Sequence, residues 1–442
     1  MKTLIKNGVL VTMNPQREII RGDLLIEDDR ICSLGPSGPE EVDLCIDARE
    51  SLVIPGLIQS HVHLCQTLFR GMADDLALLD WLQKRIWPLE ASHDSESMYI
   101  SALLGCAELL RGGTTAIIDM ASVHHTDAVF SAVQQAGIRY LGGKCLMDCG
   151  DGVPDGLLEN MDEALQESLD LRQRWEGQSG GRIRYALCPR FAVSCSDRLL
   201  RKTARLAQDF QIPVHTHAAE NRDEVALVKR ERGLPNVVYL NELGLCNPRL
   251  VLAHCIHLQD NEVSILAQSG THVAHCPSSN LKLGSGIAPV PELLEQGCNL
   301  SLGADGPPGN NNLDAFMEMR LAALIQKPGH GPQSMPAQQV FEMATLGGAR
   351  ALGLEKETGS LEPGKKADIA VVSLAGWHTR PLNAAGVYSQ LVYQVRAADV
   401  QAVLVDGKLL MQEGRLLHLD EDRLRPAGER SLQRVARRAG LF

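Results

Sequence analysis

Apolar and polar residues alternate along the chain in two different patterns. Between about residues 56 and 305, short apolar runs alternate with longer amphipathic segments. Short runs rich in β-branched residues are typical of buried strands, and the longer segments indicate helices. We count eight such runs, at residues 57–63, 114–119, 138–145, 182–188, 212–217, 250–254, 271–276 and 299–305. Eight parallel strands with helices between them predict a closed (β/α)8 barrel, the TIM-barrel architecture of the α/β class.

The segments between these runs have helix start and stop signals. Residues 97–111 end at a Gly-Gly pair, residues 197–208 follow Ser196 as a candidate N-cap, and residues 260–268 end before Gly270. These positions match the preferred caps of helices. After the last run, residues 337–352 carry apolar residues on one side, which predicts a further helix.

Both ends of the chain follow a shorter, alternating pattern. Residues 4–11, 22–26 and 369–372 predict short strands, with turns at Asp28-Asp29 and Asp406-Gly407. We expect these ends to form one small β-rich, sandwich-like domain around the barrel. The expected division is 1–55 for its N-terminal part, 56–364 for the barrel, and 365–442 for its C-terminal part with a terminal helix.

Charge and cysteine content narrow the class of protein. The net charge is −11 and no basic stripe is present, which argues against nucleic-acid and anionic-membrane partners. The arginines of residues 423–438 form an amphipathic pattern, which favours a terminal helix over a nucleic-acid arm. There is no secretory signal and no run of transmembrane length, and the twelve cysteines form no CxxC pair. We therefore expect a cytoplasmic protein with reduced thiols.

Polar residues gather where the predicted barrel strands end. Because barrel enzymes carry their chemistry at the C-terminal ends of strands, these positions are candidate site residues. They are His61 and His63 on the first strand, His217 and Glu220 after the fifth, His254 on the sixth and Asp305 on the eighth. Side chains two apart on a strand share a face, so the His-x-His pair has the spacing of metal ligands. The convergence favours a metal site over histidines buried in a core.

Several motifs occur in an order typical of one superfamily. They are PGLIQSHVH at 55–63, HAAEN at 217–221, AHC at 253–255, GAD at 303–305, ATLGGARALG at 344–353 and GSLEPGKKAD at 359–368. With these motifs the chain resembles the amidohydrolase superfamily over nearly its whole length. The resemblance is to the branch of deaminases and chlorohydrolases, which includes S-adenosylhomocysteine and methylthioadenosine deaminases, guanine deaminases and triazine hydrolases.

The resemblance implies one divalent metal held by His61, His63, His217 and Asp305. Three imidazoles and a carboxylate suit zinc, and the same donors also suit iron. His215 shares a face with His217 and is an alternative ligand, although the superfamily pattern His-x-x-Glu favours His217. The fourth strand ends in Cys188-Pro189-Arg190, without a lysine that could bridge a second metal. We therefore expect a mononuclear site.

The resemblance also implies catalytic roles for three residues. The metal lowers the pKa of its water and supplies a hydroxide nucleophile. Glu220 would carry a proton from that water to a ring nitrogen, because an amine leaves an aromatic amidine carbon only after protonation. His254 would polarise the hydroxide or the developing tetrahedral centre, and Asp305 would pass the last proton to departing ammonia.

Three further residues indicate a flat heterocyclic substrate. Gln66 can donate and accept hydrogen bonds, Arg190 offers a fork of donors, and Phe191 offers a stacking face. These residues and the run PRFAVSCS at 189–196 look like guanine deaminases. The runs QTLFRG at 66–71 and GADGPPGNNNL at 303–313 look like the adenosine-type group and the triazine hydrolases. Arg190 stands where the adenosine-type group carries a histidine.

The sequence thus predicts a metal-dependent hydrolytic deaminase that uses water to release ammonia from an amino-substituted purine-like heterocycle, as in purine metabolism. The heterocycle is of guanine or adenosine type. The alternatives are a triazine-type chlorohydrolase or cyclic-amide hydrolase on the same scaffold, and a metal-binding barrel without activity. Residues 67–90 form a long insert after the first strand, which we expect to act as a lid, a dimer contact or both. A homo-oligomer is expected from the resemblance.

Overall fold

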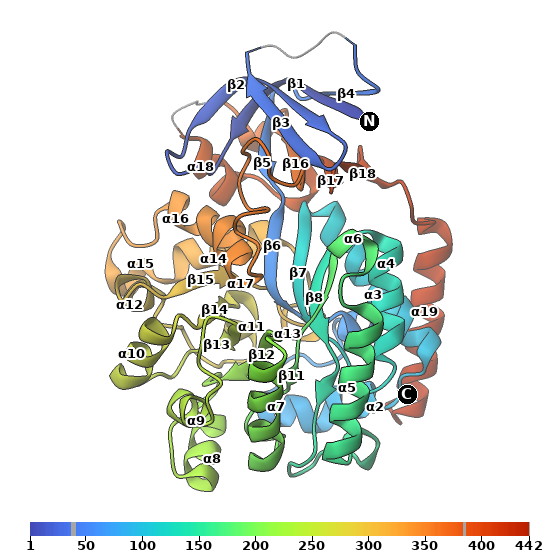
Figure 1. Cartoon of the computed structure of the whole chain (residues 1–442), viewed down its shortest axis with the longest axis vertical. Coiled ribbons are helices and arrows are strands. Elements are labelled where there is room, and N and C mark those ends of the chain that lie inside the picture. Colours follow the sequence, from blue (N-terminus) through green and yellow to red (C-terminus); the bar gives the residue numbers. More distant parts are fainter. Residues whose placement is uncertain (37–40, 383–385, 442) are drawn as a thin grey trace.

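The computed structural model describes residues 1–36, 41–382 and 386–441. It consists of a barrel and a smaller sheet that lies at one end of it, at the top of Figure 1. The chain begins in the small sheet, runs through the whole barrel and returns to the small sheet. It then ends in a long helix that descends along the side of the barrel, drawn in red in Figure 1.

The barrel contains the eight parallel strands that the apolar runs predict. They are β6 (Leu57–Val62), β7 (Thr114–Met120), β8 (Arg139–Gly143), β10 (Ile183–Tyr185), β12 (Val214–Ala218), β13 (Leu250–His254), β14 (His272–His275) and β15 (Asn299–Leu302). Their order in the sheet is β10-β8-β7-β6-β15-β14-β13-β12. The two outer strands meet through a parallel bridge between Leu187 and Val214, which closes the sheet.

Two of the predicted strands are interrupted. The third continues after β8 as β9 (Cys145–Leu146), and the fourth continues after β10 as β11 (Cys188–Pro189); β9 and β11 pair with each other. A Cβ atom on Gly143 would lie 1.9 Å from the carbonyl oxygen of Ala186. The two backbone segments therefore approach so closely here that only glycine fits, and the regular hydrogen-bond ladder between the strands breaks at this point.

Helices surround the barrel. They are α1 (Leu78–Trp81), α2 (Trp87–Ala91), α3 (Ser95–Arg111), α4 (Thr126–Ala136), α5 (Met161–Trp175), α6 (Gln178–Gly181), α7 (Asp197–Asp209), α8 (Arg222–Arg232), α9 (Asn236–Glu242), α10 (Asp260–Ser269), α11 (Pro277–Lys282), α12 (Val290–Glu295), α13 (Pro307–Asn310), α14 (Ala315–Ile325), α15 (Lys327–His330), α16 (Ala337–Glu342), α17 (Gly348–Ala351), α18 (Val387–Ser389) and α19 (Glu421–Arg438). Helices of other types include the 3-10 helix η1 (Leu64–Phe69) and the π-helix η4 (Met343–Gly347), which joins α16 to α17.

The predicted helix caps are largely confirmed. The Ser196 hydroxyl accepts a hydrogen bond from the Leu199 amide at the start of α7, and Gly270 ends α10 in the left-handed conformation. Helix α3 begins two residues earlier than predicted, because the Asp94 carboxylate caps it by accepting from the Ser97 amide. Side chains that bond the free amides of a first turn fix where a helix begins.

The small sheet combines strands from both ends of the chain. Its strands are β1 (Lys2–Val11), β2 (Ile19–Glu27), β3 (Arg30–Gly35), β4 (Leu44–Asp47), β5 (Ser51–Pro55), β16 (Ile369–Ser373), β17 (Val400–Val405), β18 (Lys408–Gln412) and β19 (Arg415–Leu416). Antiparallel pairing of β5 with β16 joins the N-terminal strands to the C-terminal ones in one nine-stranded sheet. The sandwich-like arrangement and the domain boundaries stay predictions.

A buried ion pair connects the barrel to the small sheet. Arg139, the first residue of β8, donates from Nε and Nη2 to the Asp368 carboxylate at 2.7 and 3.0 Å, and it also pairs with Asp406. The side chains of Arg139 and Asp368 are 5% and 0% exposed. A bidentate pair in this setting fixes the orientation of the two parts of the molecule.

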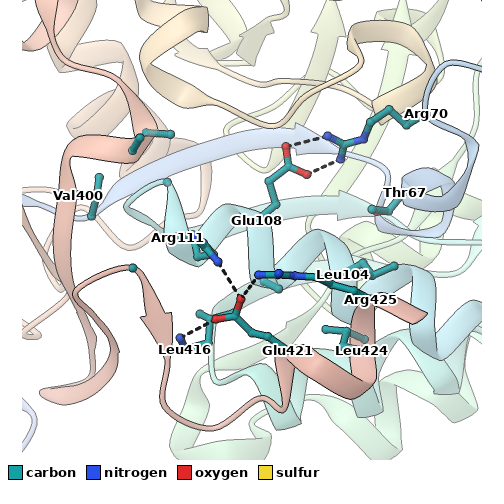
Figure 2. Close-up of a pocket in the computed structure, with 15 residues that line it drawn as sticks. Thr67, Arg70, Leu104, Glu108, Arg111, Val400, Leu416, Glu421, Leu424 and Arg425 are labelled. Atoms are coloured by element: carbon teal, nitrogen blue, oxygen red, sulfur yellow. Dashed lines mark hydrogen bonds and ion pairs between the residues drawn. The ribbon is translucent and has the colours of Figure 1, made fainter. Parts of the chain in front are cut away.

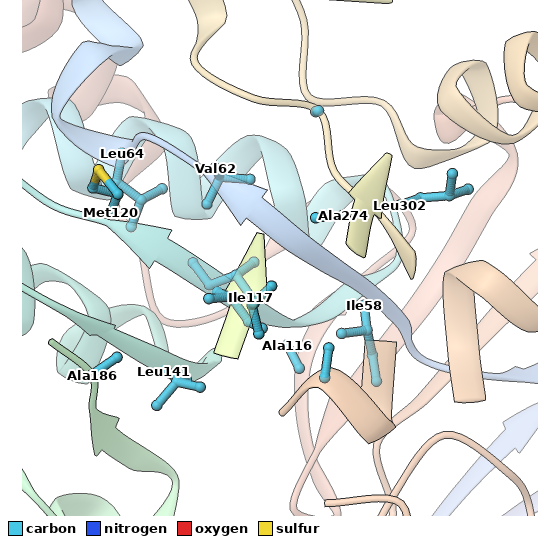
Figure 3. Close-up of a cluster of buried hydrophobic side chains, with 14 of the residues drawn as sticks. Ile58, Val62, Leu64, Ala116, Ile117, Met120, Leu141, Ala186, Ala274 and Leu302 are labelled. Atoms are coloured by element: carbon cyan, nitrogen blue, oxygen red, sulfur yellow. The ribbon is translucent and has the colours of Figure 1, made fainter. Parts of the chain in front are cut away.

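Apolar side chains fill the barrel and its surroundings. Figure 3 shows buried members of this core from the barrel strands, among them Ile58, Ile117 and Leu141. Burying each such side chain contributes about 1.5–3 kcal/mol before the entropy of ordering is counted. Helix α19 packs on α3, where Gly428 lies against Leu104, as predicted for a terminal helix. In the part of the chain that the structure describes, no helix has both the length and the apolar character to span a membrane.

Candidate active site

The six polar residues predicted at strand ends lie together at the C-terminal end of the barrel. His61 is within β6 and His63 follows it, His217 is within β12, and His254 is the last residue of β13. Glu220 and Asp305 lie in the loops after β12 and β15, so Asp305 stands three residues beyond the end of its strand. A bridge between Val62 and Asp305 keeps this loop beside β6.

Two of the histidines face each other through unprotonated nitrogens. Nδ1 of His63 lies 3.0 Å from the Met120 carbonyl oxygen, and Nδ1 of His217 lies 2.7 Å from the Arg190 carbonyl oxygen. A carbonyl oxygen only accepts, so each Nδ1 carries the hydrogen and each Nε2 carries a lone pair. The two Nε2 atoms are 3.2 Å apart. Two lone pairs at this distance repel each other unless a cation lies between them.

His61 is oriented by His215. Nδ1 of His215 lies 3.1 Å from the Val251 carbonyl oxygen, and its Nε2 lies 2.7 Å from Nδ1 of His61. By the same reasoning His215 accepts from His61, which leaves a lone pair on Nε2 of His61. That Nε2 is buried and has no hydrogen-bond partner among the described residues. The geometry therefore favours His215 as the residue that orients a ligand, and not as the alternative ligand.

Asp305 brings a negative charge to this group of rings. Its Oδ1 lies 3.2 Å from Nε2 of His61 and 3.4 Å from Nε2 of His63. Ser279 donates to its Oδ2 at 2.5 Å. Burial alone would raise the pKa of Asp305, but the neighbouring histidines, His61 first among them, hold it well below its ordinary value. The carboxylate is thus ionised at neutral pH.

These donors fit one divalent cation. Candidate ligand atoms of His61, His217, His254 and Asp305 all lie within 4.8 Å of one another. Nε2 of His63 lies beside this group, 3.2 Å from Nε2 of His217 and 3.4 Å from Oδ1 of Asp305. Burial lowers the pKa of His63 to about 3 and that of His217 well below its ordinary value, so these imidazoles stay neutral. Neutral imidazoles and a carboxylate are the donors that zinc prefers.

Glu220 and His254 form a pair beside the ligand group. Nε2 of His254 lies 3.5 Å from Oε2 of Glu220, while Nδ1 of His254 lies 2.8 Å from Oδ1 of Asn280. Burial raises the pKa of Glu220 to about 7, which His254 partly opposes. Burial alone would lower the pKa of His254, but the charge of Glu220 raises it. A carboxyl group that titrates near neutrality can both accept and donate a proton.

Two acidic residues near the site were not predicted from the sequence. Glu224 in α8 accepts a hydrogen bond from the Glu220 amide at 2.8 Å and so holds the loop that carries Glu220. Glu90 in α2 pairs with Arg190 at 2.6 Å and accepts from Gln66 at 2.7 Å. Glu224 lies one helical turn beyond Glu220, which is a usable local signal. Glu90 is 100 residues away from its partner in sequence, and no local pattern marks it.

The predicted substrate residues line the cavity above the ligand group. The lining comprises His63, Gln66, Leu78, Trp81, Leu82, Arg190, Phe191, His217, Glu220, His254 and Asp305. The cavity has a volume of about 20 Å³. This is room for about one or two water molecules, at ~10–15 Å³ each. Leu78, Trp81 and Leu82 belong to the insert after β6, which therefore forms part of the cavity wall.

A larger cavity of about 580 Å³ lies elsewhere, between α3, α19 and the small sheet. Figure 2 shows its wall, where Arg70 pairs with Glu108, and Arg111 and Arg425 both pair with Glu421. None of the strand-end histidines lines it. Because the two cavities share no lining residue, this cavity is separate from the candidate active site.

Comparison with known proteins agrees with the geometry. Residues 52–410 match the amidohydrolase family. The chain belongs to this family. It is 44% identical over 405 residues to a 5'-deoxyadenosine deaminase of Methanothermobacter thermautotrophicus, covering 91% of this chain and 92% of the relative. It is 41% identical over 428 residues to a 5-methylthioadenosine/S-adenosylhomocysteine deaminase of Moorella thermoacetica, covering 96% and 97%.

A solved amidohydrolase relative has the same fold. It is an adenosine deaminase from Xanthomonas campestris with bound zinc, which superposes with a TM-score of 0.91 at 32% identity and covers 98% of both chains. The TIM-barrel fold and the resemblance to the deaminase branch are thereby confirmed. A zinc-bound relative of this similarity also agrees with the donor set of the site, which suits one divalent metal such as zinc.

Proposed function

We propose that this amidohydrolase is a zinc-dependent hydrolytic deaminase of adenosine-type nucleosides, with 5'-deoxyadenosine as the leading candidate substrate. The observation that carries the proposal is the convergence of unprotonated imidazole nitrogens with Asp305 beside the titratable Glu220. The deaminases among its relatives, at 41% and 44% identity, support the adenosine type.

The proposed ligands of the single zinc ion are His61, His63, His217 and Asp305. His254 lies within the same 4.8 Å group, but its contact with Glu220 supports a catalytic role. When bound, a divalent ion lowers the pKa of a water molecule and supplies a hydroxide nucleophile at neutral pH. His215 and the carbonyl oxygens of Met120 and Arg190 keep the ring nitrogens in the form that binds it.

The proton transfers are assigned to the chain's own residues. Glu220 takes a proton from the attacking water and delivers it to the ring nitrogen next to the amino-bearing carbon. A carbon–oxygen bond forms at that carbon while His254 donates a hydrogen bond to the developing oxygen charge. Asp305 receives the remaining proton and passes it to the amino group, whose carbon–nitrogen bond then breaks. The products are ammonia and the oxo-substituted ring.

The insert controls access to this chemistry. A purine does not fit into a cavity of about 20 Å³, whose wall includes Leu78, Trp81 and Leu82. Substrate entry therefore requires these side chains to move away from the barrel. Closure afterwards would exclude bulk water from the reaction, as lids do in many hydrolases.

Guanine is a second candidate substrate. Gln66, Arg190 and Phe191 all line the cavity, as the resemblance to guanine deaminases predicts. An oxo-purine presents both donors and acceptors to such a set. The chlorohydrolase, cyclic-amide hydrolase and inactive-barrel alternatives are not favoured, because the relatives at 41% and 44% identity are deaminases and every proposed catalytic group is present.

Further expectations concern partners and location. We expect a cytoplasmic homo-oligomer without nucleic-acid or membrane partners; the net charge of −11 supports the last point. Light scattering on the purified protein measures the oligomeric state.

Reaction in ¹⁸O-labelled water tests the proposed chemistry. Hydrolytic deamination of 5'-deoxyadenosine replaces the amino group by one labelled oxygen, which mass spectrometry detects. An unlabelled product, or a product with an opened ring, would contradict it.

A further inference from the structure

Glu90 bridges two side chains of the catalytic cavity. Its Oε1 accepts from Nε2 of Gln66 at 2.7 Å and from Nη2 of Arg190 at 3.2 Å, and its Oε2 accepts from Nη1 of Arg190 at 2.6 Å. The side chains of Glu90 and Arg190 are 5% and 6% exposed. Gln66 and Arg190 line the cavity, whereas Glu90 is outside the lining that the described residues form. The carboxylate thus acts on the cavity only through its two partners.

The bridge fixes which end of the Gln66 amide is free. A carboxylate only accepts, so Nε2 must face Glu90 and Oε1 must face the other way. Oε1 is buried without a hydrogen-bond partner among the described residues. A Cβ atom on Gly306 would lie 1.9 Å from it, so the absence of a side chain at this position makes room for the oxygen. A buried acceptor without a partner is costly unless a ligand donates to it.

The bridge also determines which N–H groups of Arg190 remain free to bond a substrate. Two of its N–H groups bond Glu90, and Nη1 also lies 3.8 Å from Sδ of Met147. A guanidinium has five N–H groups in a rigid fork. Two of them bond Glu90 and a third points to Met147, so two donors remain in a fixed direction. Because the ion pair has no net charge, an uncharged ring meets oriented donors and not an isolated buried cation.

We propose that Glu90 is a positioning residue that determines which ring edge the cavity accepts. It holds the free acceptor of Gln66 and the remaining donors of Arg190 in one arrangement, to which the substrate ring must be complementary. The proposal rests on the proposed function, since the ring in question is the purine of the substrate. Glu90 also ends the insert, so the same contacts hold the base of the lid against the barrel.

A double-mutant cycle with Arg190 tests the proposal. In the zinc-loaded enzyme, Glu90→Gln should raise KM for 5'-deoxyadenosine at least about tenfold and change kcat less than about threefold, since uniform binding is lost. In an Arg190→Gln background, the same change should raise KM by less than about twofold, because residues that act through one contact are not additive. KM factors that multiply, or a folded Glu90→Gln enzyme with unchanged KM, would overturn the proposal.

Two further variants separate positioning from folding. Glu342→Gln removes a carboxylate that pairs with Arg17 and Arg350 outside the cavity, and it should leave KM unchanged. Gly306→Ala displaces Gln66 without touching Glu90, and it should raise KM even if Glu90→Gln does not fold. An unchanged KM in Gly306→Ala, or equal losses of zinc content and kcat in Glu90→Gln at constant KM, would assign these residues a structural role only.

A binding measurement distinguishes this proposal from the proposed function. Binding of 5'-deoxyinosine, the expected product, can be followed by tryptophan fluorescence because Trp81 lines the cavity. If the unmodified enzyme binds it with an affinity that depends on Glu90 but releases no ammonia, the proposed function fails and the role of Glu90 stands. If the enzyme releases ammonia and Glu90→Gln binds the product as tightly as the unmodified protein, the role of Glu90 fails alone. Absence of binding to the unmodified protein would overturn both.

Discussion

Nε2 of His63 lies 3.2 Å from Nε2 of His217, and the Nδ1 atom of each ring faces a main-chain carbonyl oxygen. The carbonyl oxygens select the tautomer in which both Nε2 atoms carry lone pairs. Such an arrangement is stable only around a cation, with the Asp305 carboxylate completing the charge balance.

The first prediction is therefore that the protein binds one divalent ion per chain, zinc when zinc is supplied, and that chelation destabilises it. Ligand binding to the folded state alone stabilises by about 4 kcal/mol when the free ligand is at ~1,000 times its dissociation constant. Elemental analysis and thermal unfolding before and after chelation measure both effects. Protein that carries no ion, and unfolds at the same temperature after chelation, would contradict this account of the histidines.

The second prediction concerns Glu220. Replacement by Gln keeps the shape and removes the proton acceptor, so kcat should fall by about 10²–10⁴. The zinc content should stay at one per chain, because Glu220 is not among the proposed ligands. Steady-state kinetics together with metal analysis measure these quantities. A loss of activity below about tenfold would show that another group moves the proton.

The third prediction concerns His215, which accepts from Nδ1 of His61 at 2.7 Å. Phe at this position fills similar space but cannot accept, so zinc affinity should fall about 10–100-fold, as is usual when a partner of a ligating histidine is lost. Gln offers an acceptor again and should recover part of the affinity. Competition with a zinc chelator of known affinity measures both variants. Equal affinities of the Phe variant and the unmodified protein would refute the orienting role.

The fourth prediction concerns the joint between the barrel and the small sheet. Arg139→Met leaves Asp368 and Asp406 without their shared cation, and breaking a buried pair in this way costs about 3–5 kcal/mol. Arg201→Ala breaks an exposed pair with Asp197 and should cost less than about 1 kcal/mol. Chemical denaturation of both variants gives the two free energies of unfolding. Similar small losses in both would mean that the joint does not depend on Arg139.

The sequence predicts the barrel and the residues at its strand ends because both depend on local patterns. Apolar runs place His61 and His254 at strand ends, and a parallel barrel brings such ends together whatever the loops do. The same reasoning cannot find Glu90, whose contact with Arg190 spans 100 residues. It also cannot distinguish a ligand from an orienting residue, because His215 and His217 share one face of β12 and differ only in their partners.

The closed cavity likewise depends on tertiary packing. The insert is recognisable as an extra segment, but its position over the site follows from how Leu78, Trp81 and Leu82 pack against the strand ends. Asp305 lies in a loop with φ of 63°, beyond the strand in which the apolar pattern places it. A residue other than glycine is uncommon in this left-handed conformation and is held there by its surroundings, here by Ser279 and the histidines.

The central claim is that the assembled site deaminates an adenosine-type nucleoside. Ammonia release from 5'-deoxyadenosine and from guanine, measured side by side with the zinc-loaded enzyme and with its Glu220→Gln variant, tests it most directly. We predict turnover of 5'-deoxyadenosine that depends on zinc and is lost in the variant. Turnover of guanine alone would contradict the adenosine type, and no ammonia from either substrate would contradict the deaminase.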